Sequence, residues 1–314
     1  MGAPPQSQGT AVILGGTGFI GRPVCRALAE LGYDVVAVAR RGLPVAGAGR
    51  VVALDLAAAT VAEVTDVLAA LDPTVIVNAA GGAWGLTDSD LHAANVGLVE
   101  HVLAAATALP RRVRLVQVGS VHEYGLVPIG ESMSEESATA PVTLYGKLKA
   151  HCAEMVIEAT RVGTVDGIVL RVGNVTGAGQ PAGSLLGAVA TQLHQAWIER
   201  RPAVLELGPL GSQRDFLNLT DAVAAVVAAA TRPVLEQPLV NIGHGRATSA
   251  RHLVEMLIAT SGVPTELREK PAPGPETHWQ QMRLDRARRV LGWAPSDDLG
   301  IGVRELWQHL TTEA

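Results

Sequence analysis

The sequence predicts an α/β protein built on a doubly wound parallel sheet, with a smaller and mostly helical C-terminal region. Three observations carry this prediction. Short apolar runs alternate with amphipathic helical segments along the first half of the chain. Those runs are continuously apolar, as expected for strands covered on both faces. A glycine-rich turn also follows the first run and precedes the first helical segment.

The elements of the first half follow one another at the spacing of β-α-β units. Between the expected strands lie helical segments at residues 22–31, 61–70, 89–108 and 143–161. The expected strands are residues 10–14, 34–39, 50–54, 75–78, 113–118 and 167–171.

The texture changes after residue 171. Residues 173–187 are rich in Gly, Pro and Ser and predict a loop. Residues 216–230 have the pattern of a strand followed by a helix, and strand character returns at 239–242. From residue 248 onward the pattern is mostly helical, broken by a Pro/Gly stretch at 271–275. We therefore expect a nucleotide-binding domain at 1–171, to which 215–243 returns, and an interleaved second region at 172–314.

Composition excludes several classes of function. The 314 residues carry a net charge of −5 without a basic stripe, which argues against nucleic-acid or membrane-surface partners. No apolar run approaches the ~20 residues of a membrane span. The two cysteines, Cys25 and Cys152, cannot form a disulfide framework and suit a reducing compartment, so we expect a soluble cytoplasmic protein. The nine histidines lack metal-ligand spacing, and we expect no metal site.

The glycine-rich turn is the first candidate binding site. The sequence GGTGFIG spans residues 15–21 between the first strand and the first helix. Gly15 permits the tight turn, Gly18 lets the backbone approach a pyrophosphate, and Gly21 lets helix and strand pack closely. The helix N-terminus favours the phosphate charge. A dinucleotide of the NAD(P) type is thus expected, in a Rossmann-type fold, on Gly15, Thr17, Gly18, Phe19, Ile20 and Gly21.

Further cofactor contacts are expected where later strands end. After the second strand, Ala39 stands where an acid would bind the ribose of NAD, whereas Arg40 and Arg41 suit the 2′-phosphate of NADP. NADP is therefore favoured, with NAD as the alternative. Asp55 and Leu56 suit the adenine edge. The remaining expected cofactor residues are Ala79, Ala80 and Gly81 after the fourth strand and Asn95 on the long helix.

Three residues form a candidate catalytic set. Tyr145 and Lys149 stand at i and i+4, on one side of a helix, and Ser120 follows the fifth strand at the edge where ligands bind. Ser120 would hydrogen-bond a substrate carbonyl oxygen while Tyr145 donates a proton to it. Lys149 would hold the cofactor ribose and favour ionisation of the phenol.

These motifs resemble the extended short-chain dehydrogenase/reductase family from end to end. The resemblance rests on GGTGFIG (15–21), GSVHEYG (119–125), YGKLK (145–149), RDFLNLTDAV (214–223), and NIGHGRATS (241–249) with LDRARRVLGWAP (284–295). It implies an oxidoreductase, epimerase or dehydratase that acts on a nucleotide sugar.

Two stretches resemble the 4-keto-6-deoxyhexose reductases of that family, namely GSVHEYG and RVGNVTGAGQ (171–180). The 4,6-dehydratases carry acid and base residues directly after the Ser/Thr, where this chain has Val121 and His122. NADPH-dependent 4-keto reduction is thus the leading hypothesis. A 4-epimerase is the alternative, and a dehydratase or a non-catalytic NADP-binding regulator is less favoured. The nucleotide (GDP, dTDP or UDP) stays open.

The resemblance also implies substrate contacts and an oligomeric state. Asn174 should contact the sugar or the first phosphate, and Arg214 and Arg283 the diphosphate, because guanidinium groups bind phosphate bidentately. Trp84 would form a wall of the sugar pocket, and His122 could add a proton donor beside Ser120. Family members often dimerise through two long helices, here 89–108 and 143–161, so we expect a homodimer.

Overall fold

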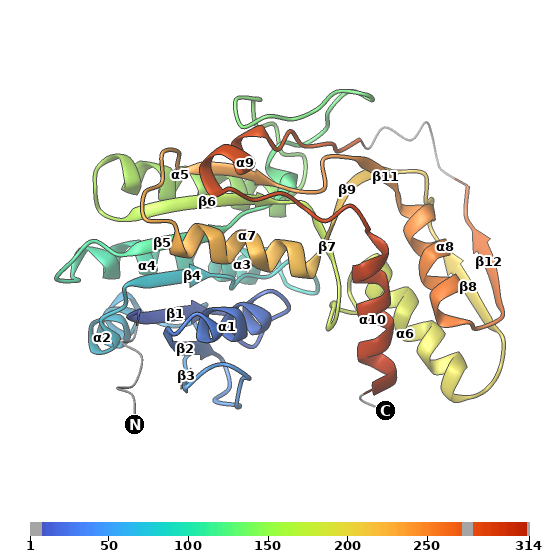
Figure 1. Cartoon of the computed structure of the whole chain (residues 1–314), viewed down its shortest axis with the longest axis horizontal. Helices are drawn as coiled ribbons and strands as arrows, with labels where there is room; N and C mark the ends of the chain where they lie inside the picture. The colour runs from blue at the N-terminus through green and yellow to red at the C-terminus, as the bar shows by residue number, and fades with distance from the viewer. Residues whose placement is uncertain (1–7, 272–278, 313–314) are drawn as a thin grey trace.

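A computed structural model describes residues 8–271 and 279–312. A seven-stranded parallel sheet forms the larger part, with strand order β10-β6-β5-β4-β1-β2-β3 (Figure 1). The strands are β1 (Thr10–Leu14), β2 (Asp34–Ala39), β3 (Arg50–Ala53), β4 (Val75–Asn78), β5 (Arg114–Val118), β6 (Asp166–Val172) and β10 (Leu239–Ile242). The fold is of the Rossmann type, as the sequence predicts.

Helices cover both faces of this sheet, which explains why its strands are apolar throughout. Alternate residues of β1 enter two different core clusters: Ala11 and Ile13 pack on one face, and Val12 and Leu14 on the other. The first face is covered by α1 (Gly21–Glu30), α7 (Leu219–Thr231) and α9 (Asp285–Leu291). The second is covered by α2 (Val61–Leu71), α4 (Leu98–Thr107) and α5 (Leu144–Arg161).

The helix expected at 89–108 is continuous but irregular. It begins as α3 (Asp88–His92), widens into a π-helical turn η1 (Ala93–Gly97) and continues as α4. Asn95 lies in that turn. Single π-helical turns within α-helices are frequent at functional sites.

A separate lobe is formed by the C-terminal part of the chain (Figure 1, right). It contains a third core cluster, built by α6 (Leu185–Ile198), α8 (Ala250–Ser261) and α10 (Gly300–Thr312) against β8 (Ala203–Leu207). Strand β12 (Thr265–Glu269) pairs in parallel with β8. A three-stranded sheet of β11 (Ala247–Ser249), β9 (Gln213–Asn218) and β7 (Asn174–Thr176) lies between this lobe and the large sheet.

Strands add detail to two expectations for this half of the chain. Residues 173–187 are not only loop, because β7 pairs with β9 and α6 begins at Leu185. The region after 248 is mostly helical, as expected, and it also contains β12. The polar sequence TELRE becomes a strand because β8 offers it a hydrogen-bonding edge. Most of the Pro/Gly stretch at 271–275 lies outside the described residues.

Candidate functional site

The glycine turn between β1 and α1 packs tightly against neighbouring backbone. Gly15 adopts φ +74°, and its N–H donates to the Val38 carbonyl oxygen at 2.9 Å. A Cβ on Gly21 would lie 2.2 Å from the Gly15 carbonyl oxygen, so only glycine lets α1 start this close to the turn. No side chain caps the N-terminus of α1, and its first turn holds no acidic residue. This end of the helix is therefore suited to a bound anion.

The residues after β2 and β3 lie at the surface near the same edge. Arg40 and Arg41 are exposed, and within the described part of the chain neither guanidinium has an ion-pair partner. Asp55 is also exposed, and its Oδ1 accepts a hydrogen bond from the Ala57 N–H at 3.2 Å. Leu56 is buried and packs in the core.

The loop after β4 packs against the glycine turn. A Cβ on Gly15 would lie 2.8 Å from the Ala80 Cα, and Ala79 and Ala80 are half-buried. Asn95 approaches the loop from the π-helical turn: its Nδ2 donates to the carbonyl oxygens of Leu91 (2.8 Å) and Gly82 (3.1 Å). Its Oδ1 is buried without a hydrogen-bond partner among the described residues, and it lies 2.9 Å from where a Cβ on Gly81 would stand. An acceptor left in this state suits a ligand or a water as donor.

Ser120, Tyr145 and Lys149 meet where β5 ends. Ser120 is buried and begins the short 3-10 turn η2 (Val121–Glu123), with its Oγ accepting the His122 N–H at 3.2 Å. That turn packs on the first turn of α5, where the His122 and Tyr145 ring centroids are 6.1 Å apart. Lys149, one helical turn later, is buried and donates through Nζ to the Val118 carbonyl oxygen at 2.7 Å. The candidate catalytic residues thus lie at one edge of the sheet, as the sequence predicts.

The sequence reasoning missed a buried ion pair next to Ser120. Glu123 is fully buried, and its Oε2 accepts from Arg171 Nε at 2.7 Å, while its Oε1 accepts the Ser120 N–H at 2.7 Å. Burial tends to lower the pKa of Arg171, but the Glu123 carboxylate outweighs it and raises that pKa. Both carboxylate oxygens are therefore engaged inside the protein. Glu123, the residue adjacent to the dehydratase positions, is not free to act on a substrate.

Asn174 begins β7, and Arg214 lies near the start of β9, the strand that pairs with it. Asn174 Nδ2 donates to the Asp215 carbonyl oxygen (3.1 Å) and to Gln280 Oε1 (2.9 Å). Arg214 is mostly buried, and burial lowers its pKa. Among the described residues its guanidinium has no ion-pair or hydrogen-bond partner. A largely buried cation without a counterion is costly, so this position suits a bound anion.

Asp215 and Gln280, which the motifs did not single out, fix this corner. Asp215 is fully buried and accepts the main-chain N–H groups of His244 (2.6 Å) and Met282 (2.9 Å). Burial raises its pKa to about 7, against the lowering by these hydrogen bonds. The two N–H donors lie 29 and 67 residues after Asp215 in the sequence. No local sequence pattern reveals contacts over such separations.

The other expected substrate residues are placed differently. Arg283 is exposed and forms a surface ion pair with Asp285 at 3.0 Å. Trp84 is 58% exposed, and its side chain approaches Gly183 from the opposite half of the molecule. His122 is half-buried beside Tyr145. Of these three, His122 is the one whose ring the structure brings beside a candidate catalytic residue.

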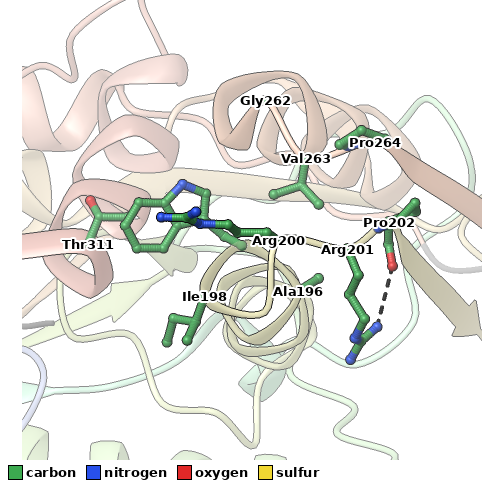
Figure 2. A pocket seen from close by; sticks show the side chains of 10 residues that line it. Ala196, Ile198, Arg200, Arg201, Pro202, Gly262, Val263, Pro264 and Thr311 are labelled. Atoms are coloured by element: carbon green, nitrogen blue, oxygen red, sulfur yellow. Dashed lines mark hydrogen bonds between the residues drawn. The ribbon is translucent and has the colours of Figure 1, made fainter.

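A cavity of about 750 Å³ lies elsewhere, on the C-terminal lobe (Figure 2). None of the predicted site residues lines it. Its walls come from the end of α6 and the loop after α8: Ala196, Trp197, Ile198, Arg200, Arg201, Pro202, Gly262, Val263, Pro264 and Thr311. Within residues 8–271 and 279–312, no three His, Cys, Asp or Glu side chains are grouped to hold a metal. No helix in those ranges is both long and apolar enough to cross a bilayer.

Comparison with known proteins identifies the family. The family model for the NAD dependent epimerase/dehydratase family matches residues 11–243. The chain belongs to this family. It is 47% identical to a dTDP-6-deoxy-L-talose 4-dehydrogenase (NAD(P)(+)) of Kitasatospora kifunensis, over 99% of both chains.

More distant relatives also match nearly the whole chain. A dTDP-L-rhamnose 4-epimerase of Burkholderia thailandensis is 26% identical over 96% of this chain and 95% of the relative. The crystal structure of UDP-glucose 4-epimerase with UDP-glucose from Thermotoga maritima superposes with a TM-score of 0.85 at 19% identity. That superposition covers 97% of this chain and 99% of the other, and it confirms the fold.

Proposed function

We propose that the chain is an NADPH-dependent reductase of the 4-keto group of a dTDP-linked 4-keto-6-deoxyhexose. The observation that carries this proposal is the 47% identity, across 99% of both chains, to a dTDP-6-deoxy-L-talose 4-dehydrogenase. Oxidation of a C4 hydroxyl with NAD(P)⁺ and reduction of the 4-keto group with NAD(P)H are the two directions of one hydride transfer. The proposal therefore specifies the direction and, through Arg40 and Arg41, the coenzyme.

The residues that would hold the dinucleotide fit it physically. The glycine turn excludes Cβ atoms and leads to a helix end without a side-chain cap. The exposed Arg40 and Arg41 would pair with a 2′-phosphate, with Asp55 and Leu56 at the adenine. Residues 79–81 and Asn95 would line the opposite side. When bound, NADPH supplies the hydride that the protein side chains cannot supply.

The chemistry that remains for the protein is proton transfer and orientation. Ser120 Oγ would donate a hydrogen bond to the C4 carbonyl oxygen and so orient the keto group. The phenol of Tyr145 would give its proton to the same oxygen as it becomes a hydroxyl. Lys149, buried one helical turn away, places a positive charge that favours the ionised phenol left behind. His122, beside the Tyr145 ring, would contact the sugar.

The substrate side is assigned by charge. Arg214 would receive the diphosphate, because it is a mostly buried cation with no counterion in the described part of the chain. Asn174 has both hydrogens of its amide engaged, which leaves its oxygen to accept from a sugar hydroxyl. Arg283 is exposed and already paired, so its contribution is expected to be smaller. Trp84 would close the sugar pocket from the loop after β4.

The test is a coenzyme assay with an enzymatically generated dTDP-4-keto-6-deoxyhexose. We expect stoichiometric loss of NADPH absorbance, slower loss with NADH, and loss of turnover in Tyr145→Phe. The GDP-linked ketosugar serves as the nucleotide control. Turnover of the GDP sugar alone would move the nucleotide assignment. No NADPH consumption with either sugar would refute the reductase.

A 4-epimerase is the second candidate, because several lower-identity relatives are 4-epimerases. An epimerase oxidises and re-reduces C4 without net coenzyme consumption. Interconversion of dTDP-hexoses with constant NADPH absorbance would therefore identify it. A dehydratase is disfavoured, because Val121 and His122 stand where acid and base are needed and Glu123 is sealed inside an ion pair. A silent NADP-binding regulator is disfavoured by the intact Ser120, Tyr145 and Lys149.

We also propose that residues 1–171 with 215–243 bind the coenzyme, and that the rest of 172–314 binds the nucleotide sugar.

We further propose that the chain forms a homodimer through the helices at 89–108 and 143–161. The outward positions of α5 are polar, including Lys147, His151, Glu154 and Glu158, so a polar interface is expected. Light scattering at micromolar concentration tests the dimer, and a monomer would refute it.

A further inference from the structure

The buried pair Glu123–Arg171 connects the candidate catalytic turn to the neighbouring strand. Ser120 and Glu123 form a reciprocal cap, in which Ser120 Oγ accepts a main-chain N–H of the turn and Glu123 Oε1 accepts the Ser120 N–H. Such a cap satisfies two main-chain N–H groups reciprocally. Here Glu123 is 0% exposed, and its second oxygen bonds Arg171 of β6 at 2.7 Å. The turn that carries Ser120 is thus fixed to β6 by charge-assisted hydrogen bonds.

Arg171 in turn lies between Glu123 and an aromatic ring. Its guanidinium carbon is 4.5 Å from the centroid of the Tyr124 ring. The Tyr124 hydroxyl donates to Asn241 Oδ1 of β10 at 2.6 Å, and Asn241 pairs with Arg171 across the two strands. Arg171 is three residues before Asn174. The same network therefore joins the Ser120 turn to the strand that leads into the proposed sugar site.

The charge of this pair lies close to the candidate catalytic lysine. Glu123 interacts electrostatically with Lys149, whose Nζ bonds the carbonyl oxygen two residues before Ser120. The titratable groups around the pair are Lys149 and Cys152 of α5, Tyr124 of the turn, and Glu135 beside Tyr124. A buried ion pair seldom stabilises a fold more than well-packed apolar residues of similar volume would. Its position beside Ser120 and Lys149 indicates another role.

We propose that Glu123 and Arg171 are positioning residues: Glu123 holds the Ser120 main chain in place, and it sets a negative charge beside Lys149 that Arg171 balances. This inference rests on the proposed function for its catalytic consequence only. The geometry predicts two separate effects. Loss of the tether displaces Ser120 Oγ and lowers the catalytic rate. Loss of the carboxylate charge leaves Arg171 unbalanced and removes a negative charge that interacts with Lys149, so the surroundings of Lys149 and of Tyr145, one helical turn before it, become more positive, which favours the tyrosinate form.

A second ion pair of β6 supplies a control. Arg114 at the start of β5 pairs with the partly exposed Asp166 at the start of β6, at the end of that strand away from Arg171, with an N–O distance of 2.7 Å. Arg114 is 8% exposed, close to the 6% of Arg171. Asp166→Asn therefore also removes the carboxylate that pairs with a largely buried arginine, but it does so away from Ser120. Any effect common to both variants reports stability alone.

The experiment compares Glu123→Gln with Asp166→Asn in the full-length protein. Two quantities are measured: steady-state kcat and KM with NADPH and the ketosugar, and the midpoint of tyrosinate absorbance without substrate. Because the chain holds only three tyrosines, subtraction of the matching Tyr145→Phe spectrum isolates this phenol. We expect Glu123→Gln to lower kcat at least about tenfold with KM changed less than about threefold, and to move the midpoint to lower pH. Asp166→Asn should leave the midpoint unchanged.

Two further variants complete the test. Arg171→Met added to Glu123→Gln removes the unpaired cation, so the midpoint should return toward that of the wild type. Arg171→Lys keeps the charge but loosens the tether, so kcat should fall while the midpoint stays. If Glu123→Gln does not fold, Arg171→Lys takes its place in the comparison with Asp166→Asn. The proposal would be overturned if Glu123→Gln and Asp166→Asn lowered kcat equally and had the same tyrosinate midpoint. A wild type without ketosugar turnover refutes the proposed function, whereas the tyrosinate titration still decides the effect of the pair.

Discussion

Lys149 Nζ donates a hydrogen bond of 2.7 Å to the carbonyl oxygen of Val118, the last residue of β5. This bond ties α5 to the strand end from which Ser120 follows. It also buries an ammonium group next to the first turn of α5, which carries Tyr145. The relation between strand end and helix therefore determines where the three candidate catalytic groups lie.

Removal of the Tyr145 hydroxyl should abolish most of the activity while leaving the fold intact. Tyr145 is half-buried, and the described residues offer its hydroxyl no hydrogen-bond partner, so Tyr145→Phe costs little stability. We expect kcat to fall by about 10²- to 10⁴-fold, the usual contribution of a positioned proton donor. Tyr33→Phe, far from the site in sequence, is the control. Near-wild-type turnover in Tyr145→Phe would remove this residue from the mechanism.

Coenzyme preference should depend on the two arginines after β2. Replacing both Arg40 and Arg41 by Ala is expected to raise the KM for NADPH about tenfold or more, because each phosphate contact by arginine contributes a charge-assisted hydrogen bond. The KM for NADH should change little. Arg112→Ala, an exposed arginine before β5, serves as the control. Equal effects on both coenzymes would show that these arginines do not recognise a 2′-phosphate.

Arg214 and Arg283 should differ in their effect on substrate binding. Arg214→Met is expected to raise the KM for the nucleotide sugar at least about tenfold. The variant lacks the largely desolvated guanidinium that would bind the diphosphate bidentately. Arg283→Ala removes an exposed ion pair and should change KM by less than about threefold. The ratio of the two effects is measured by steady-state kinetics. The reverse ranking would contradict the assignment of the diphosphate to Arg214.

The stability of the protein should depend on pH through Asp215. Burial raises the pKa of this carboxyl from 3.8 to about 7 in the folded state. The folded protein therefore binds a proton that the unfolded chain has released, so stability conferred by neutral Asp215 is complete below about pH 4. It declines as pH rises through about 7. Urea unfolding of the wild type and Asp215→Asn at pH 5 and pH 8 measures this. The wild type should lose stability relative to the variant at pH 8, and an unchanged difference would refute the prediction.

The two cysteines should be inert in the native protein. Burial raises the pKa of Cys25 to about 12 and that of Cys152 to about 11, so neither forms a thiolate near neutral pH. We expect no reaction with a disulfide reagent at pH 8 in the folded protein and release of two thiols after denaturation. Rapid reaction of the native protein would show that one of these helices opens.

The sequence by itself determined the features that depend on short range. The glycine spacing at 15–21 fixes a turn, the i, i+4 spacing of Tyr145 and Lys149 fixes a shared helix face, and continuous apolar runs fix a two-sided parallel sheet. These patterns predicted the parallel-sheet half of the fold and placed the catalytic candidates at one edge. Each of them follows from steric and hydrogen-bonding rules that operate within a few residues.

Only the tertiary structure decided the partners of the charged groups. Glu123 meets Arg171 from 48 residues away, and Asp215 is held by N–H groups 29 to 67 residues distant. Strand β12 forms from the polar sequence TELRE because β8, about 60 residues earlier, supplies its hydrogen-bonding edge. Arg214 differs from Arg283 because the fold removes the first from water and leaves the second exposed. Burial and long-range pairing set the energy of a charge, and neither is encoded in the residues next to it.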